Sequence, residues 1–168
     1  MPQNRQVLLA RRPNGAPVAD DFELVQTDVP EPGSGEMLLR TVYLSLDPYM
    51  RGRMNAEKSY ADPVPVGGVM EGGTVSVVEK SNGEKFAEGD IVVGRTGWQD
   101  YMVSDGVSLS KVDPAAAPIS TALGVLGMPG MTAYCGLLRL GKPKDGETLV
   151  VAAASGAVGA NVGQIAKI

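Results

Sequence analysis

The segment VVAAASGAVGANVGQIAKI, residues 150–168, joins an apolar run to a helical repeat through small residues. Aligned on its last glycine it reads Ala154-x-Gly156-x-x-Gly159, a variant of the glycine fingerprint for a dinucleotide pyrophosphate. A small Ala154 permits a tight turn, Gly156 lets the backbone approach the phosphates, and Gly159 lets the helix pack closely on the strand. Amides at the helix N-terminus would face the anion. The residues predicted to bind cofactor in this turn are Ala154, Gly156, Ala157, Val158 and Gly159.

A second interpretation of this turn stays open, in which small residues only allow tight packing of a strand–helix corner. The NAD or NADP preference is normally set about 20 residues beyond the fingerprint, but the chain ends at residue 168, nine residues after Gly159. A single strand–helix unit would also leave its strand uncovered. We therefore expect these residues to be part of a longer protein.

The chain has no histidine and a single cysteine, Cys135. An internal disulfide is excluded, and the common zinc sites cannot be assembled from these residue types. Nucleophile pairs that use histidine as the base are excluded as well. Any chemistry is expected to be metal-free.

The formal net charge is −4, and no run of five basic residues occurs. Nucleic acid and anionic membranes are therefore not expected as partners. The apolar stretch at 7–10 is too short for a signal peptide, and that at 149–154 is too short to span a bilayer. These features predict a cytoplasmic protein.

The first part of the chain is expected to consist of short strands. Residues 36–46 and 72–80 have extended, partly alternating patterns, and the runs at 91–94 and 98–104 each follow turn signals. Short strands at close spacing predict a small, mostly antiparallel barrel or sandwich.

The pattern changes near residues 115–120. Residues 119–127 and 131–140 look helical, with Gly141 expected as the left-handed residue that ends the second helix. Residues 147–154 predict a parallel strand, and the repeat from Gly156 onward predicts a helix that packs on it.

Four motifs together resemble one protein family over the whole chain: YLSLDPYMRGRM at 43–54, FAEGDIVVG at 86–94, LGMPGMTAYCGLL at 126–138, and GETLVVAAASGAVGANVGQIAK at 146–167. The resemblance is to the N-terminal half of zinc-independent medium-chain dehydrogenase/reductases. Within them it is to the branch of leukotriene B4 dehydrogenase/prostaglandin reductases, plant 2-alkenal reductases and bacterial NADPH-dependent curcumin reductases. RPNGAPV and GWQDY resemble the bacterial members most.

The resemblance implies a mostly β fold, with a GroES-like barrel domain followed by the first βα unit of a truncated Rossmann domain. The expected domains are 1–118 for the barrel, 119–145 for connecting helices, and 146–168 for the start of the dinucleotide-binding domain. The family reaction is hydride transfer from NADPH to the β-carbon of an α,β-unsaturated ketone or aldehyde, a small-molecule substrate. The full-length form is expected to be a homodimer.

The resemblance also places Met131 and Thr132 beside the nicotinamide. The alternative is that these residues only cap and pack the N-terminus of the connecting helix.

Tyr49 is the candidate catalytic and substrate-binding residue. Without histidine or metal, a tyrosine is the expected donor to the substrate carbonyl. Asp47-Pro48 predicts the start of a helix, so Tyr49 would lie in its first turn, where the helix dipole favours an acidic donor. In the family motif this tyrosine lines the substrate pocket; whether it donates the proton or positions the substrate stays open, as does a purely packing role.

Arg51 and Arg53 follow Tyr49 directly and could bind an acidic substrate or phosphate. The alternative is that they are solvated or paired with carboxylates, and we do not expect them to be catalytic.

Three functions remain as hypotheses. The first is an NADPH-dependent enone or 2-alkenal reductase, of which this chain alone is expected to be inactive because half of the cofactor site is missing. The second is a barrel module that binds a partner or ligand without redox chemistry. The third is a quinone-reductase-like member of the same family.

Overall fold

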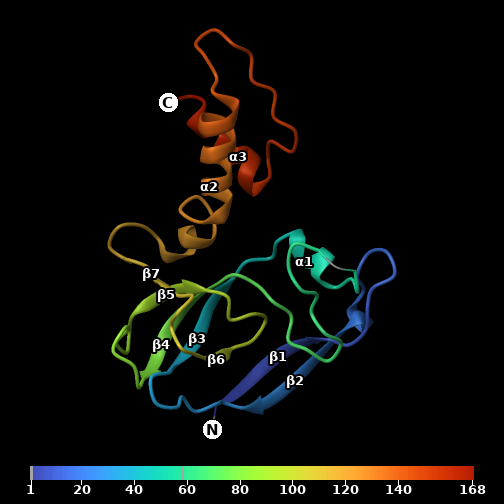
Figure 1. Cartoon of the computed structure of the whole chain (residues 1–168), viewed down its shortest axis with the longest axis vertical. Helices are drawn as coiled ribbons and strands as arrows, with labels where there is room; N and C mark the ends of the chain where they lie inside the picture. The colour runs from blue at the N-terminus through green and yellow to red at the C-terminus, as the bar shows by residue number, and fades with distance from the viewer. Residues whose placement is uncertain (1, 58) are drawn as a thin grey trace. The chain divides into compact units, whose positions relative to one another are not determined.

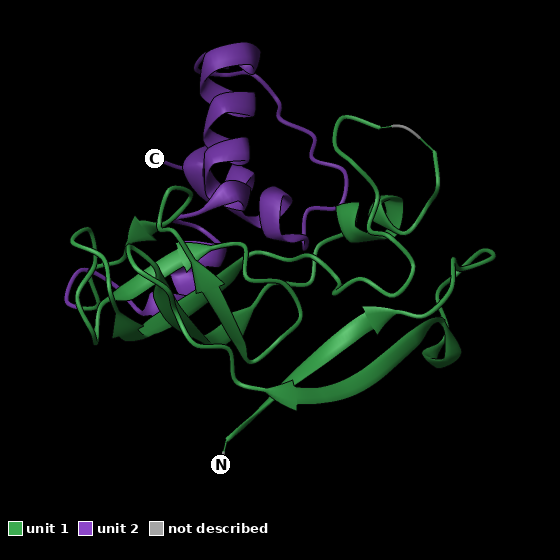
Figure 2. Cartoon of the chain, turned by 60° about the horizontal axis from the view of Figure 1, so that its bottom comes forward, with its two compact units in different colours: residues 1–114 green, residues 115–168 purple. Residues whose placement is uncertain are grey.

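The computed structural model describes residues 2–57 and 59–168, which divide into two compact units, residues 1–114 and 115–168 (Figure 2). We call them unit 1 and unit 2 and describe each by itself. Unit 1 holds the strands, labelled in Figure 1, with α1 as its α-helix. Its elements are β1 (Gln3–Leu9), η1 (Ala19–Asp21), β2 (Phe22–Asp28), β3 (Met37–Leu44), α1 (Tyr49–Arg53), β4 (Thr74–Ser81), β5 (Ile91–Gly94), β6 (Tyr101–Ser104) and β7 (Ser110–Lys111).

The strands of unit 1 form two antiparallel sheets. β1 and β2 pair as a hairpin, and the larger sheet has the order β6-β3-β4-β5-β7. The predicted strands near 36–46, 72–80, 91–94 and 98–104 correspond to β3, β4, β5 and β6. The mostly antiparallel β architecture predicted from their spacing is therefore confirmed.

Backbone hydrogen bonds join the β1–β2 hairpin to the rest of unit 1. The Val7 amide donates to the Trp98 carbonyl at 2.9 Å, and the Met70 amide donates to the Val7 carbonyl at 2.9 Å. The Trp98 amide donates in turn to the Met70 carbonyl at 2.7 Å. Segments distant in sequence thus satisfy one another's polar groups in a region where Met70 is fully buried.

Two groups of buried apolar side chains stabilise unit 1. One lies on the larger sheet, and the other connects the hairpin to the segment after α1. The first comprises Met37, Leu39, Val78, Phe86, Val92 and Leu109. The second comprises Leu9, Met54, Val64 and Met70, with Phe22 and Trp98 packed against it.

Unit 2 is helical. Its elements are η2 (Ile119–Leu123), α2 (Met128–Tyr134), η3 (Cys135–Gly141) and α3 (Ala157–Ile165). Of the predicted helix at 119–127, only the 3-10 turn η2 forms. Gly124 and Gly127 then adopt non-helical backbone angles, and Gly127 caps α2.

The predicted end of the helix at Gly141 was wrong by one residue. Residues 135–141 form a wider π-helix, in which the Lys142 amide donates to the Leu137 carbonyl at 2.8 Å. Lys142 therefore takes the left-handed conformation, with φ of 49°. The wider turn moves the end of the helix one residue further along the chain.

The predicted strand at 147–154 does not form, whereas the helix that should follow it is present as α3. Residues 147–151 are irregular and residues 152–155 form turns. A parallel strand is held by hydrogen bonds to neighbouring strands, and no strand of the described part of unit 2 offers them. An apolar, β-prone sequence is therefore not enough to form a strand at 147–154 without a partner strand.

Gly97 occupies a site that no other residue fits without strain. Its φ is +78°, and a Cβ there would lie 2.7 Å from the Met70 carbonyl oxygen. We expect Gly97→Ala to lower the free energy of unfolding of unit 1 by about 1–3 kcal/mol more than Gly89→Ala does. Gly89 is the matched control, because its φ of +86° imposes the same backbone strain but a Cβ there meets no atom within 4 Å.

Urea unfolding followed by the fluorescence of Trp98, the one tryptophan of the chain, reports on unit 1. Equal losses of stability in the two variants would contradict the close approach to Met70.

Candidate functional site

Antiparallel pairing brings the chain segments around Tyr49 together at one end of the larger sheet. Leu44, at the end of β3, pairs with Thr74 at the start of β4, and Thr74 pairs with Gly94 at the end of β5. Tyr49 follows β3, Glu71 precedes β4 and Arg95 follows β5. Glu71 and Arg95 therefore lie near α1, which Figure 1 labels, although they come from separate parts of the sequence.

α1 begins at Tyr49, so Tyr49 lies in the first turn as its sequence predicts. No side chain caps this end, and the helix has only five residues, Tyr49–Arg53. The dipole of so short a helix is small. The side chain is half-buried.

Tyr49 is a weaker acid than we expected. Burial of the phenol raises its pKa above the ordinary value of 10.0, because the charged phenolate loses hydration. Arg95 and Arg53 lower the pKa, while Glu71 and Asp47 raise it, and burial outweighs the cations. The prediction of an acidic donor was therefore wrong. Tyr49 instead keeps its proton at neutral pH and can donate a hydrogen bond.

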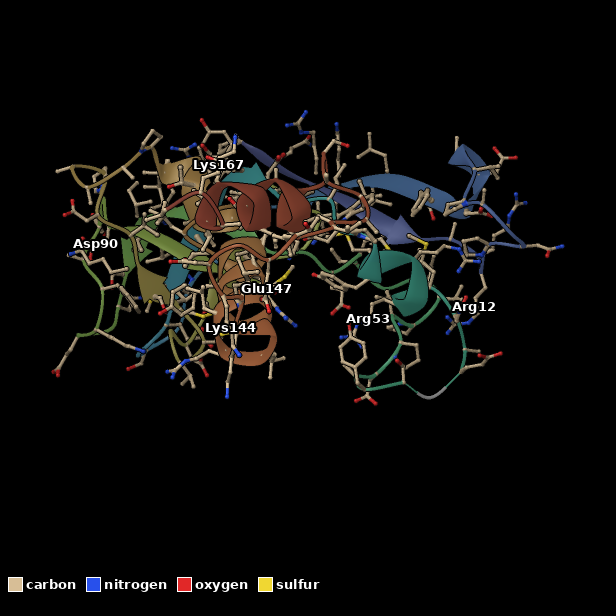
Figure 3. The ribbon with its side chains drawn as sticks, turned by 90° about the horizontal axis from the view of Figure 1, so that it is seen from above. Arg12, Arg53, Asp90, Lys144, Glu147 and Lys167 are labelled. Atoms are coloured by element: carbon tan, nitrogen blue, oxygen red, sulfur yellow. The ribbon has the colours of Figure 1, made fainter. Side chains whose placement is uncertain are left out.

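Two arginines hold the 12–15 segment against α1. Arg51 Nη2 donates to the Gly15 carbonyl at 2.8 Å, and Arg51 Nη1 donates to Asn55 Oδ1 at 2.6 Å. Arg12 Nη1 donates to the Met54 carbonyl at 2.7 Å (Figure 3). These contacts make Arg51 a structural residue.

Arg53 forms an ion pair with Glu71 and is buried, which agrees with the carboxylate-paired alternative. The sequence pattern had drawn attention to neither Glu71 nor the adjacent Gly72. A Cβ at Gly72 would lie 2.7 Å from Leu44 Cδ1 and 3.0 Å from Met50 Cε. Three segments that meet only in the folded chain define this environment, so no local pattern signals it.

In unit 2, the small residues at 154–159 form the turn that leads into α3 and the first residues of that helix. Gly156 is the N-cap of α3, and Ala153 adopts the left-handed conformation with φ of 51°. Ala154, Gly156 and Ala157 are exposed, whereas Gly159 is buried and Val158 is intermediate. A Cβ at Gly159 would lie 2.4 Å from the Ala153 carbonyl oxygen. Gly159 therefore permits a close contact between helix and turn.

Met131 and Thr132 lie on α2, which packs against α3. Thr132 donates from its hydroxyl to the Met128 carbonyl at 2.7 Å, within its own helix. Met131 is 63% exposed and lines an apolar cavity of about 410 Å³ with Tyr134, Asn161 and Ile165 among others. The residues of the turn, 154–159, do not line this cavity.

Two kinds of feature are absent from the part of the chain that the structure describes. Residues 2–57 and 59–168 contain no cluster of three or more His, Cys, Asp or Glu side chains able to hold a metal ion. None of the helices found there has the length and apolarity needed to cross a membrane.

The antiparallel architecture of unit 1 is that of a GroES-like N-terminal domain of medium-chain dehydrogenase/reductases. Residues 5–112 match the family described as the N-terminal domain of oxidoreductase. The chain belongs to this family.

Curated relatives match almost the whole chain. The NADPH-dependent curcumin reductase of Escherichia coli (strain K12) is 60% identical over 166 residues, which are 99% of this chain and 48% of that protein. The 2-alkenal reductase (NADP(+)-dependent) of Nicotiana tabacum is 43% identical, over 98% of this chain and 50% of that protein. The chain thus spans about half the length of these relatives.

A solved structure agrees with both. CurA from Vibrio vulnificus in complex with NADPH superimposes with a TM-score of 0.92 at 60% identity, over 97% of this chain and 48% of that one. The resemblance to the prostaglandin reductase and 2-alkenal reductase branch is confirmed, and so is the mostly β fold with a GroES-like N-terminal domain. Of the βα unit predicted to follow it, the described residues form the helix but not the strand.

The contact at Gly159 can be tested within α3. We expect Gly159→Ala to destabilise the turn and α3, because its Cβ would collide with the backbone at Ala153. Gly163→Ala is the matched control: no atom lies within 4 Å of its Cβ, and alanine favours a helix by about 1 kcal/mol. Hydrogen exchange of the α3 amides measures both. Faster exchange in Gly163→Ala, or unchanged exchange in Gly159→Ala, would contradict the observed contact.

Proposed function

We propose that this chain is the N-terminal part of an NADPH-dependent oxidoreductase that reduces the C=C bond of α,β-unsaturated ketones or aldehydes. The observation that carries the proposal is the 60% identity to the NADPH-dependent curcumin reductase, which runs over 166 residues and so includes both Tyr49 and the 154–159 turn. The proposed domains are 1–118 for substrate binding, 119–145 as the connection, and 146–168 as the start of the cofactor domain.

The turn before α3 fits a dinucleotide phosphate. Gly156 and Ala157 are exposed at the helix N-terminus. The Gly156 amide donates to the Ala153 carbonyl at 2.9 Å, and the amides of the first helical turn after it are those that can donate to an anion. We assign phosphate binding to Ala154, Gly156, Ala157, Val158 and Gly159, and contact with the nicotinamide to Met131 and Thr132. The exposure of Met131 and Thr132 on α2 supports the second assignment.

When bound, NADPH supplies the hydride that adds to the β-carbon of the substrate. The chain's own residues then stabilise the negative charge that develops on the carbonyl oxygen. Tyr49 can donate a hydrogen bond to that oxygen, because a phenol is protonated at neutral pH and burial raises the pKa of Tyr49 further. A proton from water then adds to the α-carbon of the enolate and completes the reduction. Tyr49 is our candidate for the catalytic and substrate-binding residue.

The proposal includes a cytoplasmic homodimer that acts on a small molecule without nucleic acid or membrane as a partner. The net charge of −4 supports the exclusion of polyanions, and the family resemblance supports the dimer.

The test is a fusion of residues 1–168 to the remaining half of the E. coli curcumin reductase, assayed with an aromatic enone. We expect consumption of NADPH in preference to NADH by the fusion, and none by the 168-residue chain alone. Tyr49→Phe should lower kcat by about 10²-fold, since it removes a donor to the developing oxyanion. Tyr43→Phe is the control, because Tyr43 lies on β3 outside α1 and is 46% exposed.

Turnover of NADPH by the isolated 168-residue chain would contradict the proposal that the chain contains only half of the cofactor site. Failure of a folded fusion to bind NADPH would favour the binding-module hypothesis instead.

A further inference from the structure

Arg53, the last residue of α1, is a buried cation held by three chain segments. Its side chain is 5% exposed, and Nε faces Oε1 of Glu71 in an ion pair. Nη1 donates to the Asp62 carbonyl at 3.5 Å, and the Arg53 carbonyl accepts from the Val64 amide at 2.8 Å. Figure 3 shows Arg53 beside α1.

The guanidinium also lies close to two aromatic rings. Its Cζ is 5.9 Å from the ring centroid of Tyr49 and 4.7 Å from that of Tyr60. Tyr49 and Arg53 are four residues apart, so both project from the same face of α1. Tyr60, from the segment after the helix, is 81% exposed. The buried guanidinium of Arg53 thus contacts two aromatic rings: that of Tyr49, the candidate donor, and that of Tyr60.

This burial sets Arg53 apart from the other ion pairs of the described residues. Their cationic side chains are 42% to 64% exposed, as for Arg40 with Glu79 and Arg5 with Asp100. Removing a guanidinium from water is costly, and one carboxylate compensates for this only in part. A buried ion pair of this kind is therefore not explained by the stability of the fold alone. In a poorly hydrated site, however, the charge acts strongly on its neighbours.

The charges that face Tyr49 come from every segment around it. Arg95, after β5, has the largest effect of these charges on the Tyr49 pKa, followed by Glu71, before β4. Asp47, before the helix, and Arg53, on the helix itself, have smaller effects on that pKa, and Arg53 is distinguished by its contact with the Tyr49 ring. Of these, Arg53 and Glu71 contact each other, so their effects on the phenol are opposed and coupled.

We propose that Arg53, held in place by Glu71, is a positioning residue that fixes the Tyr49 ring and sets the strength of its hydroxyl as a hydrogen-bond donor to the substrate carbonyl. The role in catalysis rests on the function proposed above. A cation near the ring stabilises the partial negative charge that Tyr49 acquires as it donates. Glu71 cancels part of the Arg53 charge, so that the two have opposite effects on the Tyr49 pKa.

The proposal is tested on the 168-residue chain without any assay of activity. Tyrosine labelled with ¹³C at Cζ reports the pKa of each phenol by NMR, and the Tyr49 signal is the one lost in Tyr49→Phe. We expect Glu71→Gln to lower the pKa of Tyr49, because Arg53 is then uncompensated. Arg53→Gln should raise it, and Arg53→Lys, which keeps the charge, should restore it toward the wild-type value.

Glu79→Gln is the matched control. It makes the same change of charge in the exposed Arg40–Glu79 pair on β4 and should leave the pKa of Tyr49 unmoved. Trp98 fluorescence checks folding at each pH. Should Arg53→Gln unfold, Glu71→Gln and Arg53→Lys carry the test.

An unmoved Tyr49 pKa in folded Glu71→Gln would overturn the proposal, even if the fusion protein reduces enones. Opposite shifts in Glu71→Gln and Arg53→Gln would support it. Absence of enone reduction by the fusion would instead overturn the proposed function and with it the catalytic role of Arg53. Failure of the Arg53 proposal and failure of the proposed function therefore give different experimental results.

Discussion

The antiparallel hydrogen bonding of β3, β4 and β5 decides which residues meet at the candidate substrate site. Because neighbouring strands run in opposite directions, the end of β3, the start of β4 and the end of β5 coincide. Tyr49, Glu71 and Arg95 therefore converge, although 46 residues separate the first from the last. Disruption of this register would separate the Tyr49 phenol from Glu71 and Arg95.

Burial and charge then act on Tyr49 in opposite directions. Its sequence position at the start of a helix suggests an acidic phenol, but the pKa is raised because the loss of hydration outweighs two nearby cations. A donor that remains protonated suits the stabilisation of an oxyanion better than a phenolate would. The buried Arg53–Glu71 pair lies where it can adjust that balance.

Unit 2 shows the limit of local patterns most clearly. In the 154–159 turn, α3 starts after Gly156, and the close contact at Gly159 follows from the absence of a side chain there. The apolar run before them has no partner strand in the described residues and stays irregular. The β1–β2 hairpin is the opposite case. Its first strand lacks a strong apolar alternation, yet it forms because it pairs with β2 along its length and because Val7 exchanges backbone hydrogen bonds with Trp98 and Met70.

The sequence by itself determined the strands β3 to β6 of unit 1, the helix at 157–165, the exclusion of histidine chemistry, and the family, since these depend on residue types and short spacings. Only the tertiary structure decided that Arg53 is buried, that Glu71 is its partner, and that the Tyr49 pKa is raised. Hydration and electrostatic interaction depend on distances between segments far apart in the chain. These distances are set by strand pairing and core packing, and no local pattern of residues contains them.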